Sequence, residues 1–284
     1  MENTNDLRTL DEHGWRMGFA NLFREANGSW WGTRTWLVQI FIWLCLLNGM
    51  FAIFLWKAPA DKAAEQITNI DQINTMEALQ QNQTAGALTV FLTYSSLALP
   101  IAAIIFAQDA IIGERQSGTA AWVLSKPVSR PAFILSKLGA GAIGLLVTGV
   151  VIQGVVAYIQ LSLSIGSPWP LPGFLGAMGL LILTIMVYLT LTFMLGSLFR
   201  SRGPVLGISL ALAIGGPILA SMMLPFLNEF TPWSFFMPIS EDIPSGLAMA
   251  LGQPLTSITP VVSSALLCLI FTVVTILRFQ REEF

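Results

Sequence analysis

Five long stretches of this sequence contain no aspartate, glutamate, lysine or arginine, and they limit what the chain can fold into. These stretches are residues 35–56, 78–108, 138–199, 203–228 and 243–277. A helix needs about 20 apolar residues to cross the roughly 30 Å hydrocarbon layer of a membrane. Charged residues make up only 11% of the chain, against about 25% in a soluble domain. The sequence therefore predicts a protein whose helices lie in a lipid bilayer.

The longest stretch is expected to hold two helices, because SPWPLPG at 167–173 interrupts it with three prolines. Proline lacks a backbone donor and does not continue a helix, so this tract predicts a turn. We therefore expect an all-α polytopic membrane protein with a single transmembrane domain over residues 1–284. Its six transmembrane helices are predicted at about 36–56, 87–107, 138–162, 174–198, 205–224 and 256–277.

Basic residues are divided unevenly between the two sides of this predicted bundle. All but two of the 14 lysines and arginines fall on the side that holds both termini. Cytoplasmic loops carry such an excess of positive charge, so both termini are predicted to be cytoplasmic. No cleavable signal peptide is expected, since residues 1–30 lack a short apolar core. The basic residues on the cytoplasmic side are Arg8, Arg16, Arg24, Arg34, Arg115, Lys126, Arg130, Lys137, Arg200, Arg202, Arg278 and Arg281, and those on the other side are Lys57 and Lys62.

The segment before the first transmembrane helix has a helical pattern of its own over residues 14–34. Apolar residues recur on one face, whereas Arg24 and Glu25 fall elsewhere around the helix. A helix with aromatic residues on one face and arginine on another is typical of a membrane interface. Packing on a cytosolic partner is the alternative. The residues of the apolar face are Trp15, Phe19, Leu22, Phe23, Ala26 and Trp30.

The residue types needed for most enzymes and ion-coupled carriers are missing from the predicted spans. No acid, base or histidine lies at the centre of a span, and such residues mark the ion path of coupled carriers. The single histidine, His13, precedes the first span, so a serine hydrolase would have no base in the membrane. Cys45 and Cys268 are isolated thiols and predict no metal site. The chain also has no phosphate-binding loop and no basic run for nucleic acid.

Four amides are the main polar groups expected within the spans: Gln39, Asn48, Gln153 and Gln160. Amide side chains on neighbouring transmembrane helices form hydrogen bonds with one another, and we favour that interpretation here. The alternative is that some of them line a substrate route.

The segment between the second and third spans, GERQSGTAAWVLSKPVSRP, carries detailed local signals. Gly118 is expected to stop one helix, and Thr119 to cap a short helix that ends before Pro127. Ser129 is then expected to cap the next helix, with Pro131 in its first turn. The predicted form of residues 108–137 is a helix, a short cytoplasmic cross-helix, and a helix that returns into the membrane.

This segment resembles the first cytoplasmic loop of ABC-2-type permeases, the membrane subunits of one class of ATP-binding-cassette transporters. The residues that carry the resemblance are Glu114, Ser117, Gly118, Thr119, Leu124, Ser125, Pro127, Ser129, Arg130 and Lys137. They cover about a tenth of the chain, and the six spans and the N-terminal interfacial helix are also similar to the family.

The resemblance implies that the cross-helix is a coupling helix, which sits in a groove of a separate cytosolic ATPase. It implies a working unit of two permeases, here expected as a homodimer, and two ATPases in the cell membrane of a prokaryote. ATP and magnesium would bind the ATPase, so no cofactor and no catalysis are expected on this chain. The contact residues carried over are Glu114, Arg115, Gly118, Thr119, Trp122, Leu124, Ser125 and Arg130, with Arg24 and Glu25 as support.

Three functions are compatible with these features. The first is the permease of an ATP-driven exporter, with an amphipathic substrate such as a lipid, peptide or drug, because the spans have few deep polar groups. The second is a scaffold or mechanotransmitter that relays ATPase motion to an extracytoplasmic partner without moving a substrate. The third, an ion-coupled carrier, is disfavoured by the uncharged spans.

Three further segments carry structural expectations. Residues 57–86 suggest a short amphipathic outer helix, from apolar residues at steps of three. The proline- and aromatic-rich segment 225–255 is expected outside the cytoplasm, and the resemblance suggests short re-entrant helices there. Gly215, Gly216 and Pro217 are expected to kink or break the fifth span.

Overall fold

The computed structural model describes residues 14–57, 73–237, 243–255 and 257–281. Every regular element among these residues is a helix, and none is a strand. Six helical segments are long and apolar enough to cross a membrane, which confirms the predicted fold class. We call them spans 1 to 6: Thr35–Trp56, Gln83–Gln116, Arg130–Ile165, Leu171–Leu198, Arg202–Met222 and Thr259–Gln280.

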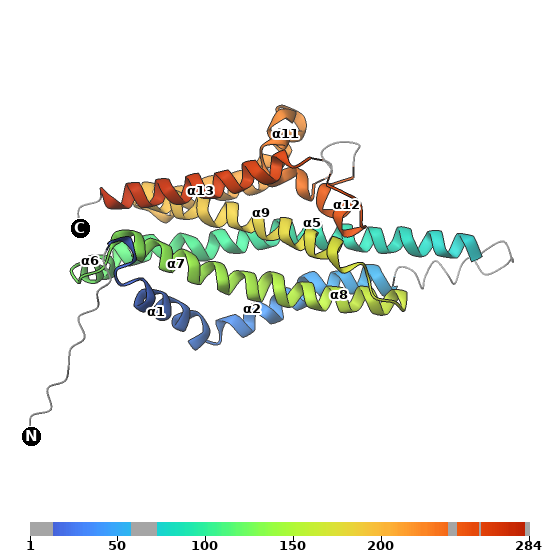
Figure 1. Ribbon diagram of the computed structural model, residues 1–284, viewed down its shortest axis with the longest axis horizontal. Coiled ribbons are helices and arrows are strands. Elements are labelled where there is room, and N and C mark those ends of the chain that lie inside the picture. The colour runs from blue at the N-terminus through green and yellow to red at the C-terminus, as the bar shows by residue number, and fades with distance from the viewer. Residues whose placement is uncertain (1–13, 58–72, 238–242, 256, 282–284) are drawn as a thin grey trace, which may run out of the picture.

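The helices are arranged side by side along one long axis (Figure 1). Their bounds, in chain order, are α1 Phe19–Gly32, α2 Thr35–Trp43, α3 Gly49–Ala52, α5 Ile73–Gln116, α6 Thr119–Leu124, α7 Arg130–Leu145, α8 Ile152–Ile165, α9 Leu171–Leu198, α10 Arg202–Leu210, α11 Gly216–Met222, α12 Ser245–Ala250 and α13 Thr259–Gln280. Short α6 lies at one end of the bundle, where α13 ends and α1 begins. We call this end the α6 end.

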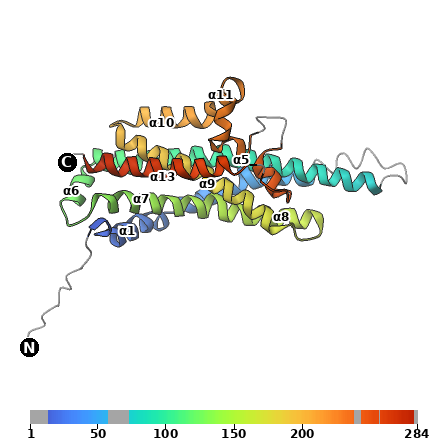
Figure 2. The ribbon, with the colours of Figure 1, turned by 45° about the horizontal axis from the view of Figure 1, so that its top comes forward.

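Span 4, formed by α9, is the centre of the bundle. In its most apolar stretch 67% of the residues are buried, against 17% in span 6, which lies on the outside. Leu181, Ile185, Leu189 and Phe193 of α9 belong to the main core cluster and are almost fully buried. Because α9 is apolar on all sides, it can be enclosed by other helices without burying a polar face. Figure 2 shows α10 and α1 on opposite sides of this central layer.

Spans 2 and 3 are longer than the sequence predicted. Span 3 has 36 residues, or about 54 Å of helix at 1.5 Å per residue, whereas the hydrocarbon layer is about 30 Å thick. Spans 2 and 3 are therefore longer than a perpendicular crossing requires, and α6 joins their ends. The separate outer helix expected within 57–86 is wrong for its described part, because α5 runs without a break from Ile73 through span 2. Residues 58–72 lie outside the described part of the chain.

The end opposite α6 is covered by short helices between spans 5 and 6, where the sequence predicted re-entrant elements. Two 3₁₀ helices, Pro225–Glu229 and Pro232–Phe235, are followed by α12, which packs on α9. The indole of Trp169 donates a hydrogen bond to the carbonyl of Ala250 at 2.8 Å, which fixes the end of α12 to the turn before α9. Whether these helices re-enter the membrane stays a prediction.

Three of the transmembrane segments contain π turns, four in all, which the sequence analysis did not predict. They are Leu44–Asn48 and Ile53–Lys57 in span 1, Leu146–Val151 in span 3 and Ala211–Gly215 in span 5. The last one precedes Gly216 and Pro217, where a kink or break was expected; the helix widens there and continues. Single π turns inside α-helices are frequent at functional positions.

Candidate functional site

The segment between spans 2 and 3 folds as its local signals predicted. Helix α5 ends at Gln116, and Gly118 follows with φ of 73°, a left-handed conformation that favours glycine. Helix α6 covers Thr119–Leu124. The hydroxyl of Ser129 then accepts a hydrogen bond from the backbone N–H of Ala132 at 3.2 Å and caps α7.

One local detail differs from the expectation. Thr119 was predicted to cap α6, but it is the first residue of that helix. Its backbone N–H instead points to the hydroxyl of Ser117 at 3.5 Å, and the two hydroxyls are 2.8 Å apart. Ser117 therefore caps α6 in place of Thr119. Gly118 forms the left-handed turn between them, which brings the Ser117 hydroxyl close to the first N–H groups of α6.

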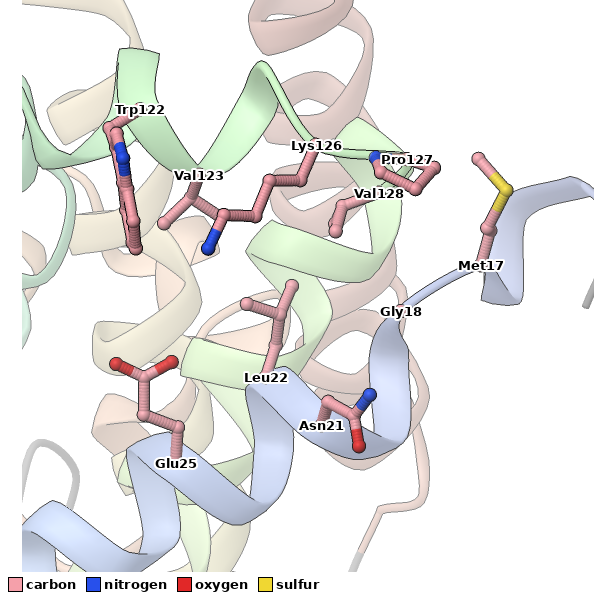
Figure 3. A pocket seen from close by; sticks show the side chains of 10 residues that line it. All are labelled: Met17, Gly18, Asn21, Leu22, Glu25, Trp122, Val123, Lys126, Pro127 and Val128. Carbon is pink, nitrogen blue, oxygen red and sulfur yellow. The ribbon is translucent and has the colours of Figure 1, made fainter. Parts of the chain in front are cut away.

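A groove of about 610 Å³ separates α6 from the N-terminal helix α1 (Figure 3). One wall comes from the start of α1 and the residues before it, and the other from α6 and the turn after it. Asn21, Leu22 and Glu25 come from α1, and Trp122, Val123 and Lys126 come from the facing segment (Figure 3). The lining residues are Met17, Gly18, Asn21, Leu22, Glu25, Trp122, Val123, Lys126, Pro127 and Val128.

Trp122 is the largest side chain of this groove, and it is 62% exposed. The ammonium group of Lys126 lies 3.6 Å from the centre of its ring, a cation–π contact that holds both side chains at the groove. Glu25 points into the gap from the opposite wall (Figure 3). The groove thus presents an aromatic surface, one cation and one carboxylate.

One end of the groove is closed by a tight contact between its two walls. Gly18 has φ of 80°, and a Cβ atom at this position would lie 2.8 Å from Cγ2 of Val128. The backbone N–H of Ser129 donates a hydrogen bond to the carbonyl of Met17 at 3.0 Å. Glycine is therefore needed at 18 for both conformation and space. The sequence analysis missed Met17, Gly18 and Val128. The one signal that could have found them is Gly18 itself, a glycine directly before the amphipathic helix.

The other predicted residues of α1 fall into two groups. Phe19 and Phe23 stack with ring centres 5.8 Å apart, and Phe23 packs against Gly139 of α7. Arg24 is exposed and does not line the groove. The side chain of Trp15 lies outside the described part of the structure. No residue of α1 is fully buried, so its predicted place in the membrane interface stays a prediction.

Glu114 and the lysine of the predicted motif form an ion pair. Nζ of Lys137 lies 2.6 Å from Oε1 of Glu114, and both side chains are about one quarter exposed. The same ammonium group is 5.2 Å from the ring centre of Phe133. The pair joins the last turn of α5 to the second turn of α7, so it fixes the two helices between which α6 is held. Leu124 is half-buried against the core, and Ser125 is exposed.

Arg115 and Arg130 were predicted to contact a partner, and the structure gives both of them bonds inside the chain. The guanidinium of Arg115 donates to carbonyls of Gly196, Ser197 and Phe199 at the end of α9. Arg130 donates to the carbonyls of Phe279 and Gln280 at the end of α13. Contact with a partner stays a prediction for both, and sequence spacing carried no signal for these long-range bonds.

The four amides expected within the spans form a buried network between spans 1 and 3. Nδ2 of Asn48 donates to Oε1 of Gln153 at 2.8 Å, and Nε2 of Gln160 donates to Oδ1 of Asn48 at 3.3 Å. Oγ1 of Thr148 donates to Oε1 of Gln39 at 3.3 Å. These bonds confirm the interpretation of interhelical hydrogen bonding. We call Gln39, Asn48, Thr148, Gln153 and Gln160 the amide network.

The amide network sits at two π turns. Asn48 ends the π turn of span 1, and Thr148 lies inside that of span 3. The side-chain Nε2 of Gln153 donates to the backbone carbonyl of Thr148 at 3.0 Å. A backbone group disturbed by an irregular turn must be satisfied within the protein, because lipid offers no hydrogen bonds. The network therefore stabilises the irregular helices as well as joining them.

No cluster of histidine, cysteine, aspartate or glutamate that could hold a metal ion occurs in residues 14–57, 73–237, 243–255 and 257–281. The sequence model of one protein family, described as ABC-2 family transporter protein, matches residues 28–284. No curated protein matches the chain.

Proposed function

The chain belongs to the ABC-2 transporter family, and from this premise we propose that it is the permease subunit of an ATP-driven exporter, coupled to a cytosolic ATPase through α6. Family membership makes it a membrane component of an ABC transporter, and the described spans agree with a multi-pass membrane protein. Export, the identity of the ATPase and the docking surface are the parts that we add.

The observation that carries the proposal is the groove between α1 and α6. It lies at the α6 end, which holds most of the lysines and arginines and is therefore the cytoplasmic side. Trp122 is 62% exposed there, on a short helix that joins the ends of spans 2 and 3. An element of the ATPase that inserts between Trp122 and Glu25 would cover the aromatic ring and pair with both charged groups.

The substrate that we propose is amphipathic, such as a lipid, peptide or drug. The deepest amides of spans 1 and 3 bond one another and are almost fully buried, so they do not offer polar contacts to a cargo. Spans 1, 5 and 6 instead expose large apolar side chains, among them Phe41, Ile218 and Leu269. A path lined by such residues favours molecules with an apolar part.

The working unit that we propose has two copies of this chain and two ATPases, in the cell membrane of a prokaryote with both termini in the cytoplasm. ATP and magnesium bind the ATPase, and this chain contributes no catalytic group. Its own role is to convert the movement of the docked ATPase into a movement of the spans.

The test is to purify the tagged chain from its native membrane in mild detergent and to measure the retained ATPase and its hydrolysis of ATP. Trp122→Ala is expected to weaken retention by about 30-fold, since truncating a buried hot-spot residue costs about 2 kcal/mol of binding free energy. Trp56→Ala, which changes an exposed tryptophan of span 1, is the matched control and is expected to retain the ATPase fully.

Elution of both variants as single species in detergent shows that the fold is retained. An ATPase held equally by the wild type and by Trp122→Ala would move docking away from this groove. A wild-type preparation without any ATP hydrolysis would contradict the proposal of an ATP-driven exporter.

A further inference from the structure

We propose that Arg115 and Arg130 are positioning residues that fasten the ends of spans 4 and 6 to the two ends of the α6 segment. The inference rests on the proposed function, because it describes how a displacement of α6 by the ATPase reaches the rest of the bundle. A connector between spans 2 and 3 would by itself move those two spans. With both arginines in place, the displacement also moves spans 4 and 6.

Arg115 stands in the last turn of α5, three residues before the left-handed Gly118. Its Nη1 donates to the carbonyl of Gly196 at 2.9 Å and to that of Phe199 at 3.3 Å, and its Nη2 donates to that of Ser197 at 3.3 Å. Three carbonyls at the end of one helix thus share one guanidinium. The planar, forked geometry of arginine permits this arrangement, which a lysine does not reproduce.

Arg130 is the first residue of α7, on the other side of the α6 segment. Its Nη1 donates to the carbonyl of Gln280 at 2.7 Å and to that of Phe279 at 3.2 Å. These carbonyls belong to the last turn of α13. The α6 segment therefore begins beside one arginine and ends at another, and each of them holds a different helix end.

Phe279 connects the two arginines. Its ring is fully buried and stacks on Phe133 of α7, with ring centres 5.5 Å apart and an angle of 6° between the planes. The guanidinium carbon of Arg115 lies 5.7 Å from the centre of the same ring. The ring of Phe279 thus contacts residues at both ends of the α6 segment. The backbone carbonyl of Phe279 also accepts a hydrogen bond from Arg130.

The chemistry of these contacts suits a firm joint. The last four carbonyls of a helix have no partner inside the helix, and the helix dipole places negative charge at that end. A guanidinium satisfies both needs, and hydrogen bonds that involve a charged donor are about twice as strong as neutral ones. The joint matters most for span 6, because only 17% of its most apolar stretch is buried elsewhere in the chain.

The experiment measures whether nucleotide bound to the ATPase changes the accessibility of the far end of span 6. The complex is purified with its ATPase, Cys45 and Cys268 are replaced by serine, and Ser257→Cys places one thiol just before α13. Its rate of labelling by a water-soluble maleimide is compared without nucleotide and with magnesium and a non-hydrolysable ATP analogue. We expect nucleotide to change this rate by about fivefold, the lower range for coupled sites.

In the fraction of the complex that holds the ATPase, Arg130→Met is expected to make the two labelling rates equal, and Arg115→Met, which loses the contact with the Phe279 ring, is expected to reduce their difference. Arg200→Met is the matched control, because it removes an exposed charge two residues beyond the end of α9, and it is expected to keep the response. If a variant only loosened the structure, the labelling rate without nucleotide would change. The ratio of the labelling rates with and without nucleotide would stay the same.

Four outcomes would overturn the inference. They are an unchanged response in both methionine variants, an equal loss in Arg200→Met, a release of the ATPase by Arg115→Met or Arg130→Met, and the absence of any response in the wild type. If either methionine variant releases the ATPase, the arginines bind the ATPase instead of passing its movement to spans 4 and 6. A wild-type chain that purifies without any ATPase is a different result. It would overturn the proposed function, and the inference that rests on it would fall as well.

Discussion

The α6 end and the amide network perform the same task, joining one helix to another, with different chemistry. At the α6 end the joints are charged: Lys137 pairs with Glu114, and Arg115 and Arg130 bind helix ends. Within spans 1 and 3 the joints are neutral amides such as Asn48 and Gln153.

The difference follows from the solvent around each region. A charge near water is desolvated only in part, so it forms strong bonds at a small cost. A charge at the centre of a bilayer costs several kcal/mol, whereas an amide finds a partner on the next helix. The stability of the α6 end should therefore depend on salt, whereas that of the amide network should depend only on packing.

The largest expected effect is that of Gln153→Leu in the amide network. The change leaves Nδ2 of Asn48 without its Oε1 partner and removes the donor to the carbonyl of Thr148. An unsatisfied buried polar group costs about 1–3 kcal/mol, and we expect a loss of this size in the free energy of unfolding in mixed micelles. The loss should not depend on salt, because no charge is involved.

Gln116→Leu is the control for this prediction, since it makes the same chemical change at an exposed position of α5. The double variant with Asn48→Leu should lose less than the sum of the two single changes, because both partners are then apolar. Additive losses would show that the two amides do not act together.

A smaller effect is expected for Glu114→Gln at the α6 end. The ion pair with Lys137 is about one quarter exposed, so solvent screens part of its attraction. We expect a loss of about 1 kcal/mol in low salt, the upper end for pairs that water still reaches. Unfolding measured again in 1 M salt should show a smaller loss, in contrast to Gln153→Leu. A loss that is the same in both salts would erase the distinction between the two regions.

The smallest effect is expected for Arg202→Met. Arg202 pairs with Asp109 of α5 at 2.5 Å, but both side chains are about half exposed. Exposed ion pairs contribute about 0.2–1 kcal/mol, so the unfolding free energy should fall by no more than this. In 1 M salt the variant and the wild type should unfold alike. A larger loss would place α10 among the helices that the α6 end holds firmly.

The local features of the α6 segment were predictable because each depends on a few neighbouring residues. Gly118 ends a helix wherever a left-handed turn is needed, and Ser129 caps α7 through a bond to Ala132, three residues away. The direction of Arg115 was not predictable in this way. Its partners at the end of α9 are more than eighty residues further along the chain. Nothing in the spacing of the loop distinguishes an arginine that faces a partner from one that faces a helix end.

The groove shows the same limit. The family resemblance assigned both Glu25 and Trp122 to an interface with a partner, without saying how they lie relative to each other. Only the packing of α1 along α7 brings them to opposite walls of one groove. This packing depends on Gly144, where a side chain would overlap the ring of Trp30. The π turns were missed for a related reason, since a helix widens where its neighbours supply hydrogen bonds that no local pattern records.

Local patterns along the chain were enough to establish its six membrane spans, the side that carries the positive charge, and the turns of the α6 segment. These features follow from charge-free stretches, basic loops, glycine and proline. Each of these acts through the bilayer or through adjacent residues, so its effect can be predicted from the local sequence. The tertiary structure alone decided which helix end each arginine binds, which amides meet within spans 1 and 3, and how α1 and α6 enclose a groove. These depend on contacts between residues far apart in sequence, and the packing of whole helices sets their geometry.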